Sequence, residues 1–195
     1  MPHVTAIVLA AGASTRMGDE NKLLLPFRGK PLLSAAVEAV CASSVDDVVV
    51  VTGHEDRQIR DVLDSYPIRV AYNPEYAAGV ATSIRRGLIA CPPETDGFAV
   101  CLGDMPFITE HTISRLHRSF LEQGEASIVV AVSRGRRTYP VIIHQAFRDE
   151  LMQLSGDSDL GPVLDAHPEV VAEMDVGTEG VTVDTPEAYE EVRNL

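Results

Sequence analysis

The sequence predicts a three-layer α/β/α fold around a mostly parallel, Rossmann-like sheet. Runs rich in β-branched residues, such as Asp47–Thr52 and Ser127–Val132, show no alternation with polar residues. That pattern is typical of parallel strands buried on both faces. Segments of helical period separate these runs, and such alternation builds βαβ units with helices on both sides of a sheet.

The expected elements follow one another along residues 1–195, and no repeat, low-complexity tract or linker divides them. We therefore expect a single domain. Apolar runs predict strands at Val4–Ala10, Asp47–Thr52, Ile68–Tyr72, Phe98–Leu102, Ser127–Val132, Tyr139–Ile143 and Val170–Met174. Helical periodicity predicts helices at Pro31–Ala42, Arg57–Ser65, Ala81–Ala90, Glu110–Gln123, Ala146–Leu154, Leu160–Ala166 and Pro186–Val192.

Local signals support several of these boundaries. The pair Asn73-Pro74 interrupts regular structure after the third strand, and the Pro/Gly-rich patches at 91–95 and 177–180 indicate loops. Thr185 is a good N-cap for the last helix, with Pro186 in its first turn.

Charge is distributed unevenly along the chain. The net charge of −13 argues against nonspecific nucleic-acid binding by the whole surface. Residues 1–30 nevertheless carry a balance of +2, whereas residues 146–195 carry thirteen acidic residues against two arginines. A small basic site in an acidic molecule suits a small anionic ligand. An acidic tail that only aids solubility is the simpler interpretation of residues 146–195.

The three cysteines are scattered and form no CxxC pair, so the sequence indicates neither a disulfide framework nor a zinc site. This usage suits a reducing compartment. The sequence begins with no secretory leader pattern, and no run approaches the roughly 20 apolar residues of a membrane span. We expect a cytoplasmic protein without a membrane partner.

The segment Ala10–Gly18 follows the first strand, at the end of the sheet where α/β proteins bind ligands. Its small residues allow a ligand close to the backbone, and successive N–H groups can form an anion nest. Arg16 can bind phosphate oxygens through two parallel N–H bonds. The chain has fourteen arginines but only two lysines, Lys22 and Lys30. A compact ammonium at position 22, which the planar head of arginine does not replace, indicates phosphate chemistry.

Small residues alone fit a tight turn between a strand and a helix equally well. The loop has neither the Gly-Lys-Ser/Thr ending of a Walker A motif nor a G-x-G-x-x-G pattern. A G-x-S-x-G elbow is also absent, so acyl transfer has no support. The histidines are dispersed without metal-ligand spacing.

The stretch LAAGASTRMG…NKLLLPFRGKPLL, residues 9–33, resembles the signature of nucleotidyltransferases that build activated sugars and cofactors. The closest likeness is to MobA-like enzymes, in particular the molybdenum cofactor cytidylyltransferases. The resemblance implies a fold of the nucleotide-diphospho-sugar transferase (GT-A-like) type, and it places Arg16 and Lys22 on the phosphates of a nucleotide. The resemblance also implies that four residues contact the nucleotide through their backbone, namely Leu9, Ala10, Ala11 and Gly12.

The segment Asn73–Ile84 follows the third strand and opens a helix. Thr82 and Ser83 fit helix caps and ligand-binding hydroxyls equally well. The segment resembles the NP-x4-G-x3-S element of the family, which implies that Gly79 and Ser83 lie near the nucleobase and ribose.

Asp104 follows the fourth strand, where a buried carboxylate is costly without a partner. A bound Mg²⁺ removes that cost, because it takes oxygen ligands. The alternative is that Asp104 caps the helix that begins near Thr109, but five residues separate the two positions. The resemblance favours the metal, since Gly-Asp-x-Pro carries a magnesium-binding aspartate in this family. Mn²⁺ also accepts such ligands.

Two segments of the carboxyl half carry further candidates. In similar proteins an aspartate before Thr-Pro-Glu lies near the metal as a second ligand, and the resemblance assigns this role to Asp184. The arginines at 134, 136 and 137 fit either a solvated hairpin or an anion clamp for the acceptor. Residues 156–161 look like the Gly-Asp-x-Gly element of the family, but one residue is added and no arginine follows, so no catalytic role is transferred.

The residues and the resemblance together predict Mg²⁺-dependent transfer of a nucleotidyl group from a nucleoside triphosphate to a phosphorylated acceptor, with release of pyrophosphate. Ala10-Ala11 before Gly12 looks like the cytidylyl enzymes, so we expect CTP, a molybdopterin-type acceptor, and a molybdoenzyme or its chaperone as protein partner. The alternatives are a transferase for sugar or alcohol phosphates, a guanylyltransferase that uses GTP, and a non-enzymatic cofactor-delivery protein. A pure binding protein need not keep Arg16, Lys22 and Asp104, which favours an enzyme.

Overall fold

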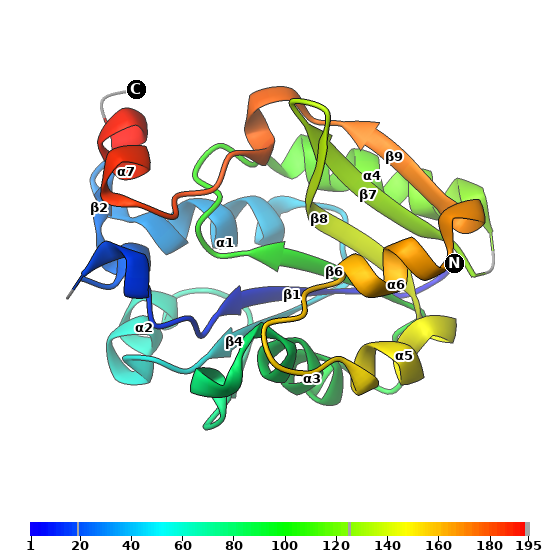
Figure 1. Cartoon of the computed structure of the whole chain (residues 1–195), viewed down its shortest axis with the longest axis horizontal. Helices are drawn as coiled ribbons and strands as arrows, with labels where there is room; N and C mark the ends of the chain where they lie inside the picture. The colour runs from blue at the N-terminus through cyan, green and yellow to red at the C-terminus, as the bar shows by residue number, and fades with distance from the viewer. Residues whose placement is uncertain (19, 125, 194–195) are drawn as a thin grey trace.

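The computed structural model of the chain shows a central sheet between two layers of helices (Figure 1). It describes residues 1–18, 20–124 and 126–193. The strands of the central sheet are β1 (Val4–Ala10), β4 (Asp47–Thr52), β5 (Arg69–Tyr72), β6 (Gly97–Leu102), β7 (Ile128–Ser133), β8 (Arg136–His144) and β9 (Val171–Asp175). Within the described residues they lie in the order β5-β4-β1-β6-β8-β7-β9.

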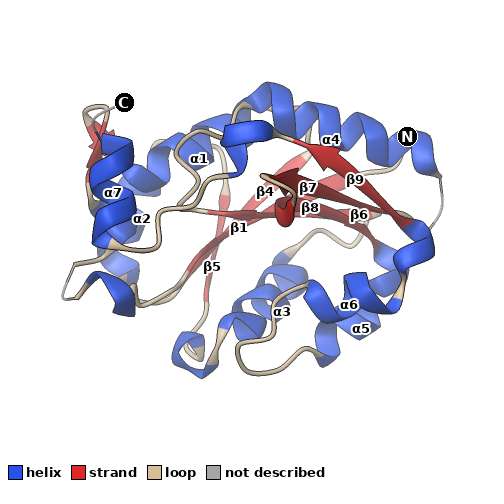
Figure 2. Ribbon diagram, turned by 45° about the horizontal axis from the view of Figure 1, so that its top comes forward, coloured by secondary structure: helices blue, strands red, loops and turns tan. Residues whose placement is uncertain are grey.

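Helices cover both faces of this sheet, and Figure 2 shows the sheet between them. The α-helices are α1 (Leu32–Ala42), α2 (Asp56–Leu63), α3 (Val80–Ala90), α4 (Glu110–Gln123), α5 (Arg148–Gln153), α6 (Gly161–Ala166) and α7 (Pro186–Arg193). Buried residues of α1, α2 and α4 share one core cluster, and those of α3, α5 and α6 share the other. Helix α7 packs in a third, smaller cluster with Met17 and Phe27.

Short elements complete the chain. A two-stranded sheet joins β2 (Pro26–Phe27) to β3 (Lys30–Pro31). The 3₁₀ turns are η1 (Thr15–Met17), η2 (Lys22–Leu24), η3 (Tyr76–Ala78), η4 (Gln145–Phe147), η5 (Pro168–Val170) and η6 (Gly177–Gly180). In the described part of the chain, no helix combines the length and the apolar character that a membrane crossing needs.

Strand β1 lies in the middle of the sheet, parallel to both of its neighbours. Ile7 is paired with Val49 of β4 on one side and with Val100 of β6 on the other. Among the strands of the described residues, only β8 runs against the rest, because it pairs antiparallel with β6 and with β7. Two residues with positive φ, Arg134 and Gly135, connect β7 to β8. So short a connection requires an antiparallel hairpin. The predicted mostly parallel α/β fold is therefore confirmed.

The predicted boundaries agree with the structure for most elements. The strands β1 and β4 and the helix α4 have the predicted bounds. The strand predicted at 139–143 begins earlier, at Arg136, because the hairpin continues the ladder to Ser133. The β2–β3 pair was not predicted, since two-residue strands are too short to show periodicity.

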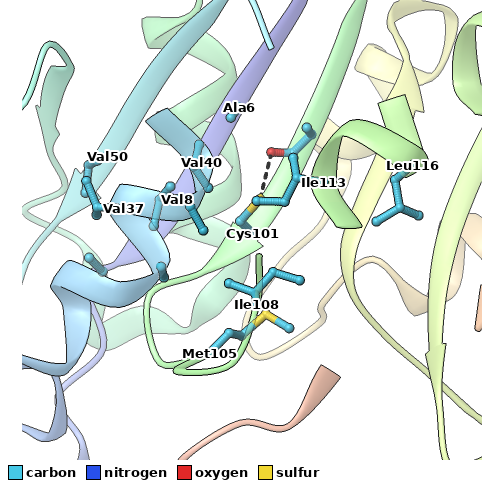
Figure 3. Packing of buried hydrophobic residues seen from close by; sticks show 14 of the residues in the cluster. Ala6, Val8, Val37, Val40, Val50, Cys101, Met105, Ile108, Ile113 and Leu116 are labelled. Atoms are coloured by element: carbon cyan, nitrogen blue, oxygen red, sulfur yellow. Dashed lines mark hydrogen bonds between the residues drawn. The ribbon is translucent and has the colours of Figure 1, made fainter. Parts of the chain in front are cut away.

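The sheet is buried on both faces, as its unalternating apolar runs predict. All seven residues of β1 are buried. On the face covered by α1 and α4, Val8 and Cys101 pack with Val37, Val40 and Ile113 (Figure 3). This packing fixes the carboxyl ends of β1 and β6, from which the loops of the site extend.

Gly87 provides a test of the packing of α3 on the sheet. A Cβ at this position would lie 2.3 Å from Cγ2 of Ile7 and 3.3 Å from Cγ2 of Val51. Replacing a mid-helix glycine by alanine ordinarily stabilises a helix by about 0.5–1 kcal/mol. Overpacking a core costs about 1–3 kcal/mol. We expect Gly87→Ala to lower the free energy of unfolding by about 1–2 kcal/mol, measured by urea denaturation.

Gly12→Ala is the matched control, since a Cβ at Gly12 meets no atom within 4 Å. It should change the free energy of unfolding by less than about 0.5 kcal/mol. A Gly87→Ala protein as stable as the parent would contradict the close contact between α3 and β1.

Candidate active site

A cavity of about 510 Å³ opens at the carboxyl ends of β1 and β6, as the rule for open α/β sheets predicts. Nine of the ten residues predicted for the site line this one cavity. They are Leu9, Ala11, Gly12, Arg16, Lys22, Gly79, Ser83, Asp104 and Asp184. The tenth, Ala10, is 1% exposed and packs in the core on the α1 side of the sheet.

The loop after β1 holds Lys22 through its backbone. Ser14 adopts a positive φ of 52°, and its carbonyl accepts a hydrogen bond of 2.7 Å from the Met17 N–H. The Ser14 hydroxyl oxygen accepts a second bond, of 3.2 Å, from the Lys22 N–H. Asn21 then caps the η2 turn by accepting from the Leu23 N–H at 3.1 Å. The loop therefore folds back on itself and directs the Lys22 side chain into the cavity that it lines.

The Lys22 ammonium is shared by two carboxylates from distant parts of the chain. Its Nζ donates to Asp104, 82 residues away, and to Oδ1 of Asp184 at 2.7 Å, 162 residues away. The side chains of Lys22 and Asp104 are 17% and 7% exposed, and that of Asp184 is 35% exposed. Arg16 donates to the same Oδ1 of Asp184 at 3.1 Å, from a side chain that is 66% exposed. This bonded cluster therefore contains two cations and two carboxylates, and Asp157 and Asp159 add two more carboxylates to the cavity lining.

Burial and charge act against each other in this group. Burial alone lowers the pKa of Lys22, but the charges and hydrogen bonds of Asp104 and Asp184 outweigh it and hold that pKa above its usual value. Burial raises the pKa of Asp104, and the nearby Lys22 offsets part of this effect. Burial also raises the pKa of Asp184, but bonding to Lys22 outweighs it and leaves that pKa below its usual range. For each carboxylate, a nearby cation therefore lowers the pKa against the effect of burial.

Close backbone contacts determine the position of Asp104. The preceding residue, Gly103, donates its N–H to the Leu9 carbonyl at 3.0 Å, and a Cβ there would lie 2.8 Å from Cδ1 of Leu33. The Asp104 carbonyl accepts from the Val183 N–H at 3.0 Å, which ties the segment before α7 to the end of β6. This bond brings residue 184 to the cavity.

The helix-cap alternative for Asp104 is wrong. Thr109 caps α4, because its hydroxyl oxygen accepts a hydrogen bond of 3.2 Å from the Thr112 N–H. At the other helix, Thr185 acts as the predicted cap of α7 and accepts from the Ala188 N–H at 3.2 Å. Asp184 is therefore not needed for capping.

The residues present fit a divalent cation that is shared with phosphate. Oδ1 of Asp104 is buried and has no hydrogen-bond partner, and the Asp184 carboxylate accepts a bond from the same ammonium as Asp104 does. Among the described residues, no group of three or more His, Cys, Asp or Glu side chains could hold a metal alone. A cation here would take its remaining ligands from substrate or water. Mg²⁺ commonly binds in this way, through one or two carboxylates and substrate phosphates.

The start of α3 forms the wall opposite the loop. Gly79 has φ +109°, and a Cβ on it would lie 2.1 Å from the Gly156 carbonyl oxygen. The same oxygen accepts from the Ala81 N–H at 3.2 Å, so residues 156–157 pack directly on the helix start. Asn73 donates to the hydroxyls of Thr82 and Ser83 at 2.9 and 3.0 Å. Neither hydroxyl caps α3, and Ser83 lines the cavity.

Several basic residues singled out in the sequence lie outside the cavity. Lys30 pairs with Glu38 at 2.5 Å, and its side chain is 61% exposed. Arg137 donates to Glu173 at 2.8 Å and to Asp165 at 3.3 Å. Residues 134 and 136 are also absent from the cavity lining as the structure describes it. In this structure the three arginines form no clamp at the cavity.

Among the lining residues that were not predicted for the site, four carry aromatic or acidic side chains. They are Tyr76, Tyr139, Asp157 and Asp159. Tyr139 lies in β8, where the sequence indicates only a strand, and burial raises the pKa of its hydroxyl. Tyr76 lies inside the NP-x4-G-x3-S segment and was a possible candidate from that position. The two tyrosines add aromatic surface to the cavity walls.

Known proteins resemble this chain in sequence and in fold. The sequence profile of the MobA-like NTP transferase domain matches residues 6–170. The chain is 30% identical over 194 residues to nicotine blue oxidoreductase of Paenarthrobacter nicotinovorans, covering 96% of the chain and 95% of that protein. It is 32% identical over 195 residues to the bifunctional protein GlmU of Thermus thermophilus, covering 96% of the chain but 40% of GlmU. The chain thus spans less than half the length of that relative.

A solved structure shows the same fold. Rv0371c of Mycobacterium tuberculosis H37Rv superposes with a TM-score of 0.86 at 24% identity, covering 100% of this chain and 99% of that one. A second structure of that protein, in complex with manganese, gives a TM-score of 0.80 at 25% identity and covers 98% of each chain.

The contact between Gly79 and Gly156 provides a test of the cavity wall. We expect Gly79→Ala to displace the 156–157 loop, because the new Cβ cannot fit against the Gly156 carbonyl and the φ of +109° is strained for alanine. The free energy of unfolding should fall by about 1–3 kcal/mol, and nucleotide affinity measured by calorimetry should fall with it. Gly156→Ala is the control, since it has positive φ but no atom within 4 Å of the new Cβ. Equal effects of the two substitutions would contradict the close contact.

Proposed function

The chain belongs to the MobA-like NTP transferase family, and we propose that it transfers a nucleoside monophosphate from a nucleoside triphosphate to a phosphorylated acceptor, releasing pyrophosphate. The observation that carries the proposal is the Lys22 ammonium shared by Asp104 and Asp184 in a cavity lined by a small-residue loop. The proposal takes residues 1–195 as one nucleotidyltransferase domain. The family profile ends at residue 170, but Asp184 also contributes to the cavity.

The proposed reaction is an in-line displacement at the α-phosphorus of the nucleotide. An oxygen of the acceptor phosphate forms a bond to that phosphorus, and the bond from the phosphorus to the oxygen bridging the β-phosphate breaks. A phosphate monoester is already anionic near neutral pH, so no general base is needed. Catalysis then consists of positioning and charge neutralisation. Lys22 neutralises charge on the α-phosphate, and Arg16 binds the leaving pyrophosphate.

Asp104 and Asp184 are the residues that would hold Mg²⁺. The buried, unpartnered Oδ1 of Asp104 supports this assignment. The manganese complex of Rv0371c supports a divalent cation in this fold. When bound, the cation would supply further neutralisation of the phosphate oxygens.

The base and ribose are assigned to the side of the cavity between the β1 loop and α3. Leu9, Ala11 and Gly12 of this loop and Gly79 and Ser83 of the segment that opens α3 all line the cavity, which supports the assignment. We propose CTP as the nucleotide and a molybdopterin-type acceptor. Ala10-Ala11 before Gly12 supports the pyrimidine, because guanylyl relatives tend to show Ala-Gly-Gly there.

The name of the relative from Paenarthrobacter raises a redox reaction as the alternative. The observation that favours transfer is the cation and carboxylate group at the cavity, which matches what a triphosphate and a metal require. A sugar phosphate as acceptor would use the same group, and acceptor competition distinguishes it from molybdopterin.

The direct test is pyrophosphate release from CTP, GTP, ATP or UTP in Mg²⁺, with and without molybdopterin. We expect release only when CTP and molybdopterin are both present, because the transfer needs both substrates. Release with a sugar phosphate instead would replace the acceptor. No pyrophosphate from any pairing of nucleotide with molybdopterin or a sugar phosphate would contradict nucleotidyl transfer.

Replacement of the site lysine should affect the chemical step. We expect Lys22→Ala to lower kcat by about 10²–10³-fold, by analogy with the loss of one preorganised donor. Steady-state kinetics measure the effect, and Lys30→Ala is the control because Lys30 pairs with Glu38 outside the cavity. A near-parental kcat in Lys22→Ala would contradict the role given to Lys22.

The residue before Gly12 tests the choice of base. The side chain of Ala11 is almost wholly buried beside Gly53, at the edge of the cavity. We expect Ala11→Gly to lower the ratio of kcat/KM for CTP to that for GTP, because loss of the methyl widens the base site. An unchanged ratio would show that Ala11 does not select the base.

A further inference from the structure

Four charged groups of the site are bonded to one another in the structure. Lys22 and Arg16, which are proposed to bind phosphate, donate to Asp104 and Asp184, which are proposed to hold the metal. Lys22 is bonded to both carboxylates at once. The proposed phosphate ligands and the proposed metal ligands therefore satisfy each other's charges.

We propose that Lys22 is the counter-ion of Asp104 and Asp184 in the free protein and transfers to the nucleotide on binding, so that metal and nucleoside triphosphate bind cooperatively. The inference rests on the proposed function only in taking a nucleoside triphosphate as the ligand of the cavity. It adds the reason why the metal should bind weakly to the protein alone.

The burial of the group gives this arrangement its strength. Charges in a partly buried site interact more strongly than in water, because the surroundings screen them less. A metal ion that arrives alone meets carboxylates already neutralised by Lys22, and its positive charge is repelled by the ammonium. Displacing Lys22 without a new partner would leave an ammonium unpaired, in a side chain that is 17% exposed.

A triphosphate removes this obstacle. Lys22 has a flexible four-carbon stem and lines the cavity, so it can exchange carboxylate partners for phosphate oxygens. The more exposed Arg16 can leave Asp184 in the same way. The carboxylates are then free for the cation. Thermodynamic linkage requires the effect to be reciprocal, so the metal must strengthen nucleotide binding by the same factor.

A fixed structural ion pair is the competing interpretation. It predicts that removal of Lys22 costs stability and adds nothing to metal affinity. The proposed exchange also predicts that removal of Lys22 lowers stability in chelator. Added metal should then take the place of the ammonium and restore the stability of the protein. The two interpretations therefore differ in a measurement that involves no catalysis.

The experiment is calorimetric titration of Mn²⁺ into the full chain, with and without a non-hydrolysable CTP analogue. For the parent protein, we expect the analogue to tighten Mn²⁺ binding at least tenfold. Lys22→Met should bind Mn²⁺ at least tenfold more tightly than the parent without nucleotide, and the analogue should add little. Lys30→Met is the matched control, since it removes the only other lysine, and it should behave as the parent does.

Thermal unfolding measures any loss of stability in Lys22→Met. Its Tm should fall in chelator and recover in Mn²⁺, whereas the Tm of the parent should change little. The double variant Lys22→Met/Asp104→Asn leaves no such unpaired buried charge and should lose the tight Mn²⁺ binding. Equal Mn²⁺ affinity of the parent and Lys22→Met without nucleotide, or no recovery of Tm, would overturn the proposal. Because no turnover is measured, the outcome does not depend on whether nucleotidyl transfer is confirmed.

Discussion

The site depends on one constraint, which is that the buried carboxylate of Asp104 must have a cation beside it. Its side chain is 7% exposed at the end of a central strand, where an unpaired charge would be strongly destabilising. In this structure Lys22 supplies the cation, and Asp184 shares it. The β1 loop, the end of β6 and the segment before α7 therefore meet at one point, although they are distant in the sequence.

The fold makes this meeting geometrically possible. Parallel pairing of β1 with β6 brings their carboxyl ends together, and Gly103 lets the following turn pass close to Leu9 and Leu33. On the other wall, Gly79 allows the 156–157 loop to contact the start of α3. Small residues thus occur where two segments of backbone approach, and the space left between them forms the cavity.

The sequence was sufficient to predict the fold class, because unalternating β-branched runs and helical periods are local signals. Residue type and spacing also predicted that Arg16 and Lys22 lie at the site, and both line the cavity. The sequence favoured Lys22 over Lys30, which it placed in a solvated turn, but it did not predict the pairing of Lys30 with Glu38, because that pairing depends on how the β2–β3 turn meets α1. The sequence also did not show that the arginines at 134, 136 and 137 lie away from the cavity, or that Tyr139 lines it. Whether a strand residue faces the cavity depends on hairpin register, which periodicity does not determine.

Because the chain contains only two lysines, NMR of its side-chain ammonium groups can test the central role of Lys22 directly. Protein labelled with ¹⁵N at lysine Nζ would be titrated with a non-hydrolysable CTP analogue and Mg²⁺, with Lys30→Met to assign the two signals. The account predicts that the Lys22 signal shifts on binding while the Lys30 signal stays in place. Binding that leaves the Lys22 signal unmoved would contradict it, because the ammonium at the centre of the site would then have no contact with the nucleotide.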